Sequence, residues 1–229
     1  MAIGKPKVGK KTGAGIGAAL LIILGAVFAN EGGYVNDPAD PGGATNHGIT
    51  QEVARKHVYT GDMRDFPKHC AVEVDAETGT INIADLRDPM PEVWPCADSI
   101  LVHDYIAKPG FMPLVEIDPA VAEEVIDTAV NMGPARPSRW FQASVNATCN
   151  TTLQVDGRIG PMTVKAWGDC RVNLGPRVCV AMLHRLDGYQ EAEYDRLVRV
   201  NPRLKRFRRG WQNYRIGNVD PAQCWREGA

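Results

Sequence analysis

The stretch that decides the fold is Glu31-Gly-Gly-Tyr-Val-Asn-Asp-Pro-Ala-Asp40-Pro-Gly-Gly-Ala-Thr45-Asn-His-Gly-Ile-Thr50. It holds two carboxylates in contrasting surroundings. Glu31 follows an uncharged apolar segment, which favours the neutral form of a carboxyl group. Asp40 lies in a run of prolines and glycines, which is typical of an exposed turn. Cleavage of a glycosidic bond uses such a pair, because one carboxyl protonates the leaving oxygen while the other activates water or stabilises the developing cation. We therefore predict Glu31 as the acid and Asp40 as the second carboxylate.

Other polar residues of this stretch have less specific interpretations. Asp37 lies between an asparagine and a proline, so we interpret it as a turn residue. The hydroxyl of Thr45 could orient a water molecule or Asp40, although a threonine here could equally be a strand residue of a hairpin. Tyr34 and His47 lie beside the carboxylates in the sequence, and we predict that both line the substrate cleft.

The whole stretch resembles the signature of glycoside hydrolase family 108, whose members are peptidoglycan-degrading N-acetylmuramidases. Glu31 and Asp40 are also in register with the Glu-x8-Asp-x5-Thr triad of phage-type lysozymes. Thr45 falls one residue short of that triad, so the third catalytic residue stays open between Thr45 and Thr50. The resemblance implies a mainly α, lysozyme-like α+β fold with a small β-hairpin. It also implies an endolysin that hydrolyses the β-1,4 bond between N-acetylmuramic acid and N-acetylglucosamine and so lyses the host cell.

The N-terminal segment predicts a membrane helix. Four lysines precede the uncharged residues 13–30, whose helical length of about 27 Å barely spans a bilayer. The lysines would keep the N-terminus in the cytoplasm, so that the rest of the chain is exported. The segment resembles the signal-arrest-release helix of phage endolysins, which implies a phage-encoded protein held in the host inner membrane and then released to the periplasm. The alternative is a signal peptide cleaved after Ala29, which would leave Glu31 near a frayed terminus.

The cysteines indicate an oxidising compartment. Their number is even and they lack the paired C-x-x-C spacing of a zinc site, which favours disulfides. We predict a bond between Cys70 and Cys96, which flank a long loop, and leave the other four cysteines open among three arrangements. The five histidines also lack a zinc-enzyme motif, and we expect them to be surface or hydrogen-bonded residues. We predict neither a metal nor another cofactor.

The C-terminal half resembles the predicted peptidoglycan-binding domain that accompanies family 108 catalytic regions. The resemblance rests on residues 127–142 and 155–163. Within these ranges we predict that Asn131 and Trp140 contact the substrate, although a tryptophan at this helical spacing is also a typical core residue. We divide the chain into a membrane segment at 1–30, a catalytic domain at 31–118, and a helical peptidoglycan-binding module with a basic tail at 119–229.

The charge is distributed unevenly along the chain. Residues 31–130 hold 19 acidic and 6 basic residues, whereas residues 131–229 hold 16 basic and 8 acidic residues. The run from Arg196 to Arg215 contains eight lysines or arginines and no acid. Such a run fits a polyanionic partner or a solvated helix face. Because an exported chain rarely meets nucleic acid, we predict peptidoglycan as the partner, with the inner membrane before release, no nucleic acid, and a monomer when active.

Two other functions fit the same sequence. A lytic transglycosylase needs the acid but no second carboxylate, because a hydroxyl of the sugar itself attacks. A non-catalytic tether would bind the wall through the basic half and the membrane through the N-terminus. Digestion of purified peptidoglycan distinguishes all three.

Overall fold

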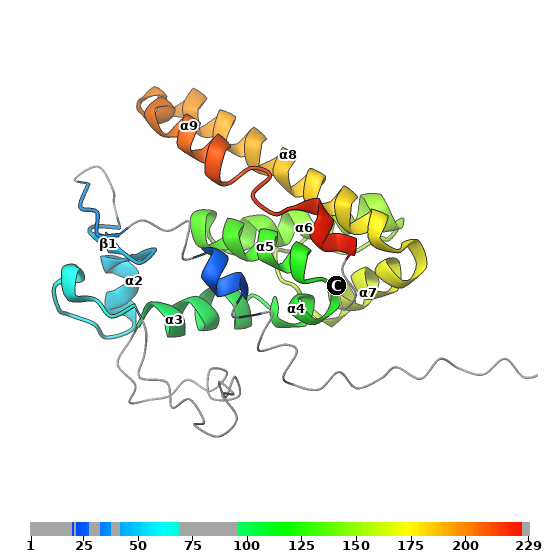
Figure 1. Cartoon of the computed structure of the whole chain (residues 1–229), viewed down its shortest axis with the longest axis horizontal. Helices are drawn as coiled ribbons and strands as arrows, with labels where there is room; N and C mark the ends of the chain where they lie inside the picture. Colours follow the sequence, from blue (N-terminus) through cyan, green and yellow to red (C-terminus); the bar gives the residue numbers. More distant parts are fainter. Residues whose placement is uncertain (1–19, 21, 28–32, 38–41, 69–95, 226–229) are drawn as a thin grey trace, which may run out of the picture.

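The computed structural model describes residues 20, 22–27, 33–37, 42–68 and 96–225. Over these residues the protein is mainly helical, with one two-stranded antiparallel hairpin (Figure 1). The predicted fold class, a mainly α fold with a small hairpin and a helical C-terminal module, is confirmed.

The first half of the chain contains the hairpin and short helices. The elements are β1 (Thr45–Asn46), β2 (Ile49–Thr50), α2 (Gln51–Lys56), η1 (Met63–Asp65), α3 (Ala97–Ile100), η2 (Leu101–Ala107) and α4 (Met112–Ile117). Helix η2 is a π-helix that directly continues α3. A small hydrophobic cluster under the hairpin includes Ile49, Met63 and Phe66.

Longer helices make up the second half. They are α5 (Pro119–Met132), α6 (Ala135–Cys149), α7 (Pro161–Leu174), α8 (Pro176–Val200) and α9 (Lys205–Tyr214), with the short turns η3 (Pro202–Leu204) and η4 (Pro221–Trp225). Pro119, Pro161 and Pro176 each open a helix, where the missing N–H of proline has no intrahelical partner to lose. Helix α5 is buried along most of its length and packs against α4, α6 and α8. It is therefore the central element of the main core.

The described part of the apolar N-terminal segment belongs to this core. Residues 20 and 22–27 are helical, and Leu20, Ile23, Leu24 and Val27 are buried in the main hydrophobic cluster, whereas Ile22 is 68% exposed. These buried positions follow the i, i+3, i+4, i+7 spacing of one helix face. The predicted inner-membrane location is therefore wrong: over the described residues, no helix combines the length and the apolarity that crossing a bilayer requires. Leu20, Ile23, Leu24 and Val27 are instead buried against other parts of the protein.

Two disulfides hold the second half together. Cys149 at the end of α6 is bonded to Cys170 of α7, and Cys179 of α8 is bonded to Cys224 of η4. This is one of the three arrangements that the sequence leaves open. Cys96 is also disulfide-bonded, while its predicted partner, Cys70, lies outside the described residues.

The distal half of α8, η3 and α9 form a helical hairpin, residues 187–215, that we call the C-terminal arm. Figure 1 shows it extending from the helical body on the same side as β1. Tyr194 of α8 stacks on Trp211 of α9, with ring centroids 4.6 Å apart. An ion pair of 2.7 Å between Arg208 and Asp195 also joins the two helices. The two antiparallel helices of the arm are thus held to each other by a stacked pair and an ion pair.

Candidate active site

The candidate site is built on the hairpin of β1 and β2. Thr45 pairs with Thr50 and Asn46 with Ile49, so only His47 and Gly48 form the turn. Both turn residues have positive φ, 51° and 77°, as a type I′ turn requires. Gly48 adopts this conformation at no steric cost, and its presence explains why the chain reverses here. The position of the half-buried His47 is therefore set by the turn.

A buried amide fixes the hairpin to the loop below it. The side chain of Asn46 donates a hydrogen bond of 2.8 Å to the carbonyl oxygen of Met63. Asn46 is only 4% exposed, so this bond replaces the water that both groups lose on folding. The neighbouring Thr45 points to the opposite face of the strand, because side chains alternate along a strand.

The segment after Glu31 pairs with the strand that carries Thr45. The N–H of Val35 donates to the carbonyl of Thr45 at 2.9 Å, and the N–H of Thr45 donates to the carbonyl of Val35 at 2.8 Å. Tyr34 therefore lies beside β1, and the residue is 41% exposed. Glu31 and Asp40 themselves lie outside the described residues. The described residues that precede and follow Asp40 in the sequence are thus brought together at β1.

The two candidate threonines have different surroundings. The hydroxyl of Thr50 accepts a hydrogen bond of 3.3 Å from the N–H of Val53 and so caps the start of α2. Thr45 is half-buried, and its hydroxyl makes no hydrogen bond to the residues that the structure describes. Thr50 is therefore engaged in stabilising a helix, whereas the hydroxyl of Thr45 is available for another role.

Two histidines, one at the C-terminal end of α2 and one in η2, contact the same carboxylate. Asp104 of η2 is 2.7 Å from Nε2 of His57 and 2.8 Å from Nδ1 of His103. Partial burial opposes ionisation of Asp104, but the two hydrogen bonds hold the pKa of its carboxyl below the usual range. These contacts tie α2 to η2, and both histidines are hydrogen-bonded as predicted. Within the described ranges, no cluster of histidine, cysteine and acidic side chains could hold a metal ion.

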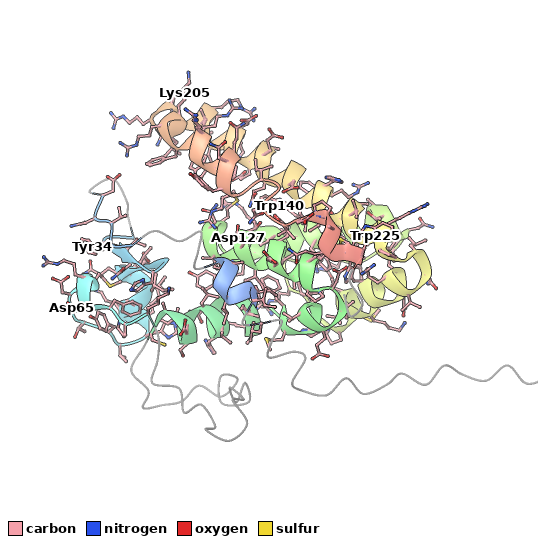
Figure 2. All side chains as sticks on the ribbon, viewed as in Figure 1. Tyr34, Asp65, Asp127, Trp140, Lys205 and Trp225 are labelled. Carbon is pink, nitrogen blue, oxygen red and sulfur yellow. A yellow bond between two sulfur atoms is a disulfide. The ribbon has the colours of Figure 1, made fainter. Side chains whose placement is uncertain are left out.

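Asn131 and Trp140 lie at helix contacts in the second half. Asn131 of α5 donates to the hydroxyl of Tyr194 at 2.5 Å, at the base of the C-terminal arm. Trp140 of α6 stacks on Tyr189 of α8, with ring centroids 5.8 Å apart and 9° between the ring planes. Figure 2 shows Trp140 well separated from Tyr34 along the long axis of the molecule. Trp140 and Tyr34 therefore do not share one compact site, and the substrate contacts of Asn131 and Trp140 stay predictions.

An ion pair that the sequence did not predict joins the arm to the catalytic stretch. Arg206 of α9 donates to a carboxylate oxygen of Asp37 at 3.0 Å, across 169 residues of sequence. Asp37, interpreted above as a turn residue, thus also holds the arm beside residues 33–37. The opposite charges of the two halves of the chain were the signal that could have pointed to this contact.

The base of the arm is anchored in the core through a buried ion pair. Arg215 donates to Asp127 of α5 at 2.6 Å, and the carboxylate side chain is only 2% exposed. One turn earlier on α5, Glu124 is 1% exposed and accepts a hydrogen bond from Thr128. Burial raises the pKa of Glu124 well above its usual value, and the nearby acids Asp187 and Asp127 raise it further. Several acidic side chains are therefore buried in the protein, and one of them, Asp127, forms an ion pair with Arg215 at the base of the arm.

Two family models match this chain. The model described as Glycosyl hydrolase 108 matches residues 24–133, and the model described as Predicted Peptidoglycan domain matches residues 136–216. The protein is a glycoside hydrolase that acts on peptidoglycan. The first match begins inside the apolar segment, in agreement with the burial of Leu24 and Val27 in the core of the enzyme. The two matches meet between α5 and α6, whereas the domain boundary predicted at residue 118 precedes α5 and stays a prediction.

A solved structure of Brucella abortus SagA resembles this glycoside hydrolase. The TM-score is 0.56 at 23% sequence identity, and the alignment covers 91% of this chain and 94% of the SagA chain. At this identity the likeness shows the fold alone. No curated protein matches the chain significantly.

Proposed function

We propose that this enzyme is an N-acetylmuramidase, which hydrolyses the β-1,4 bond between N-acetylmuramic acid and N-acetylglucosamine. Glu31 protonates the glycosidic oxygen, and Asp40 activates water or stabilises the oxocarbenium-like transition state. The observation that carries this proposal is the pairing of Val35 with Thr45, because it brings residues 33–37, which lie between the two carboxylates in the sequence, against the strand that carries Thr45.

Thr45 completes the proposed catalytic set. Its hydroxyl orients the attacking water or the carboxylate of Asp40. The capping bond of Thr50 supports this choice, because a hydroxyl that accepts from the start of α2 is already committed to the fold. Thr45 therefore takes part in the reaction, whereas Thr50 stabilises the fold by capping α2.

The enzyme works in an oxidising compartment, the periplasm or the cell exterior. The support is the pair of disulfides in the second half and the match to a peptidoglycan domain, since disulfides form and persist outside the reducing cytosol. In that compartment, cleavage of the glycan strands weakens the wall and lyses the cell, as phage endolysins do.

Digestion of purified sacculi tests the reaction. The wild type should release fragments with a reducing N-acetylmuramic acid end that contain one added water, whereas an anhydro end would make the enzyme a transglycosylase. Glu31→Gln should abolish release because an amide cannot protonate the leaving oxygen. A fully active Glu31→Gln enzyme would remove Glu31 from the mechanism.

The two threonines provide a matched pair of variants. Thr45→Val should lower kcat while the melting temperature stays near that of the wild type. Thr50→Val should lower the free energy of unfolding by about 1 kcal/mol through loss of the helix cap, with little change in kcat. The opposite result for the pair would exchange the two assignments.

A further inference from the structure

The tip of the C-terminal arm carries cations without acidic partners. Arg196, Arg208 and Arg215 each pair with a carboxylate, and Arg206 pairs with Asp37. Four further exposed cations make no ion pair with any residue of the described chain; they are Arg199, Arg203, Lys205 and Arg209. We call these four residues the cationic tip. No acid lies between positions 196 and 215, so the positive charge there is neutralised only by acids outside this range: Glu193 and Asp195 on the arm itself, and Asp37 and Asp127 elsewhere.

The cationic tip lies beside the catalytic stretch. The ion pair between Arg206 and Asp37 places the start of α9 next to the segment that links Glu31 to Asp40. Figure 2 shows Lys205 at the end of the arm on the same side of the molecule as Tyr34. We therefore expect a glycan strand that is cleaved at this stretch to pass close to these cations.

The arm holds its cations in a defined position. Trp211 stacks on Tyr194, whose hydroxyl accepts from Asn131 of the central helix α5. Arg215 is fixed to the buried Asp127 on the same helix. A surface that is oriented before the ligand arrives loses less entropy on binding, which favours recognition over a loose charge attraction.

The chemistry of the substrate identifies the ligand. The sugar backbone of peptidoglycan is uncharged, and its negative charge lies on the carboxylates of the peptide stems, which are attached to N-acetylmuramic acid. Arginine is suited to carboxylates because its planar guanidinium donates two parallel hydrogen bonds. We propose that the cationic tip binds the stem carboxylates of the strand being cleaved, so that the enzyme selects peptide-bearing glycan over bare glycan. This proposal rests on the glycan cleavage proposed above.

The test compares two substrates with the same glycan. One is peptidoglycan with its stems, and the other is that glycan after an amidase has removed the stems and the lactyl carboxylates exposed by this cleavage have been converted to amides. We expect the wild type to have kcat/KM about tenfold higher for the stem-bearing glycan, since each exposed ion pair contributes up to about a factor of five. In Arg203→Gln/Arg209→Gln the ratio should fall toward one through KM, and 0.5 M salt should have the same effect on the wild type.

Arg177→Gln/Arg185→Gln is the matched control, because it removes the same charge from two exposed positions of α8 outside the arm. This control should keep the wild-type ratio. Equal cleavage of both substrates by the wild type, or an equal loss of selectivity in the control, would overturn the proposal. So would a tip variant that binds anionic phospholipid vesicles less well but keeps its selectivity, since the tip would then be a membrane contact.

Binding of each glycan is measured in parallel by co-sedimentation with the Glu31→Gln enzyme. This measurement separates the two proposals. If neither glycan is cleaved but the stem-bearing one binds better through the tip, the proposed reaction fails and the carboxylate site stands. If both are cleaved and bound equally, the reaction stands and the carboxylate site fails.

Discussion

Ile22 and Ile23 allow a direct test of whether the apolar N-terminal segment belongs to the folded enzyme. Ile23 is 1% exposed within the main cluster, whereas its neighbour Ile22 is 68% exposed. Truncating a buried isoleucine to alanine typically costs 2–5 kcal/mol, so we expect Ile23→Ala to lower the free energy of unfolding by about 3 kcal/mol. For a protein of this length, that loss lowers the melting temperature by roughly 6–12 °C. Ile22→Ala should change the free energy by less than about 0.5 kcal/mol.

Thermal unfolding of the purified variants, followed by circular dichroism at 222 nm, measures the difference. The two substitutions remove the same atoms from adjacent residues, so helix propensity and composition cancel in the comparison. Equal melting temperatures for the two variants would refute the assignment of this helix to the core. A larger loss in Ile22→Ala would show that the opposite face of the helix is the buried one.

Three further predictions concern stability. Asn46→Ala should lower the free energy of unfolding by about 1–3 kcal/mol, because it leaves the buried carbonyl of Met63 without its donor; unchanged chemical denaturation would contradict this. Because burial raises the pKa of Glu124, the folded protein binds protons more readily than the unfolded chain, and the free energy of unfolding should increase as the pH falls from 7.5 to 5.5. Glu124→Gln should flatten this dependence and raise the melting temperature at pH 7.5, and a pH profile as steep as that of the wild type would argue against a buried, proton-binding Glu124. Replacing Cys149 and Cys170 together by serine should cost roughly 3 kcal/mol on the loop-entropy model, measured by urea denaturation under oxidising conditions, where a wild-type midpoint would contradict the prediction.

The sequence was most informative where structure depends on neighbouring residues. The hairpin from Thr45 to Thr50 depends on turn residues whose backbone preferences act locally. A small hairpin was expected, although its turn at His47 and Gly48 was not. The openings of the long helices at Pro119 and Pro176 depend on equally local chemistry. The mainly helical fold with one small hairpin was expected from the resemblance to family 108 and is confirmed.

The sequence was least informative about which surfaces pack against each other in the folded protein. Residues 13–30 are apolar on every side, so the pattern could not reveal that Ile23 faces the core and Ile22 faces outward. A bilayer and a protein core attract such a segment through the same burial of apolar surface. The ion pair of Arg206 with Asp37 was also hidden, because composition shows that two regions attract but not which two side chains meet.

The main core takes members from both ends of the described chain, from Leu20 to Cys224. During synthesis, the first of these residues leaves the ribosome long before the last. The C-terminal residues of the main core are therefore absent for most of the synthesis. Contacts between residues so distant in sequence also form slowly. We therefore expect the main core to close only after Cys224 has been synthesised, so that the complete enzyme is assembled late rather than during synthesis.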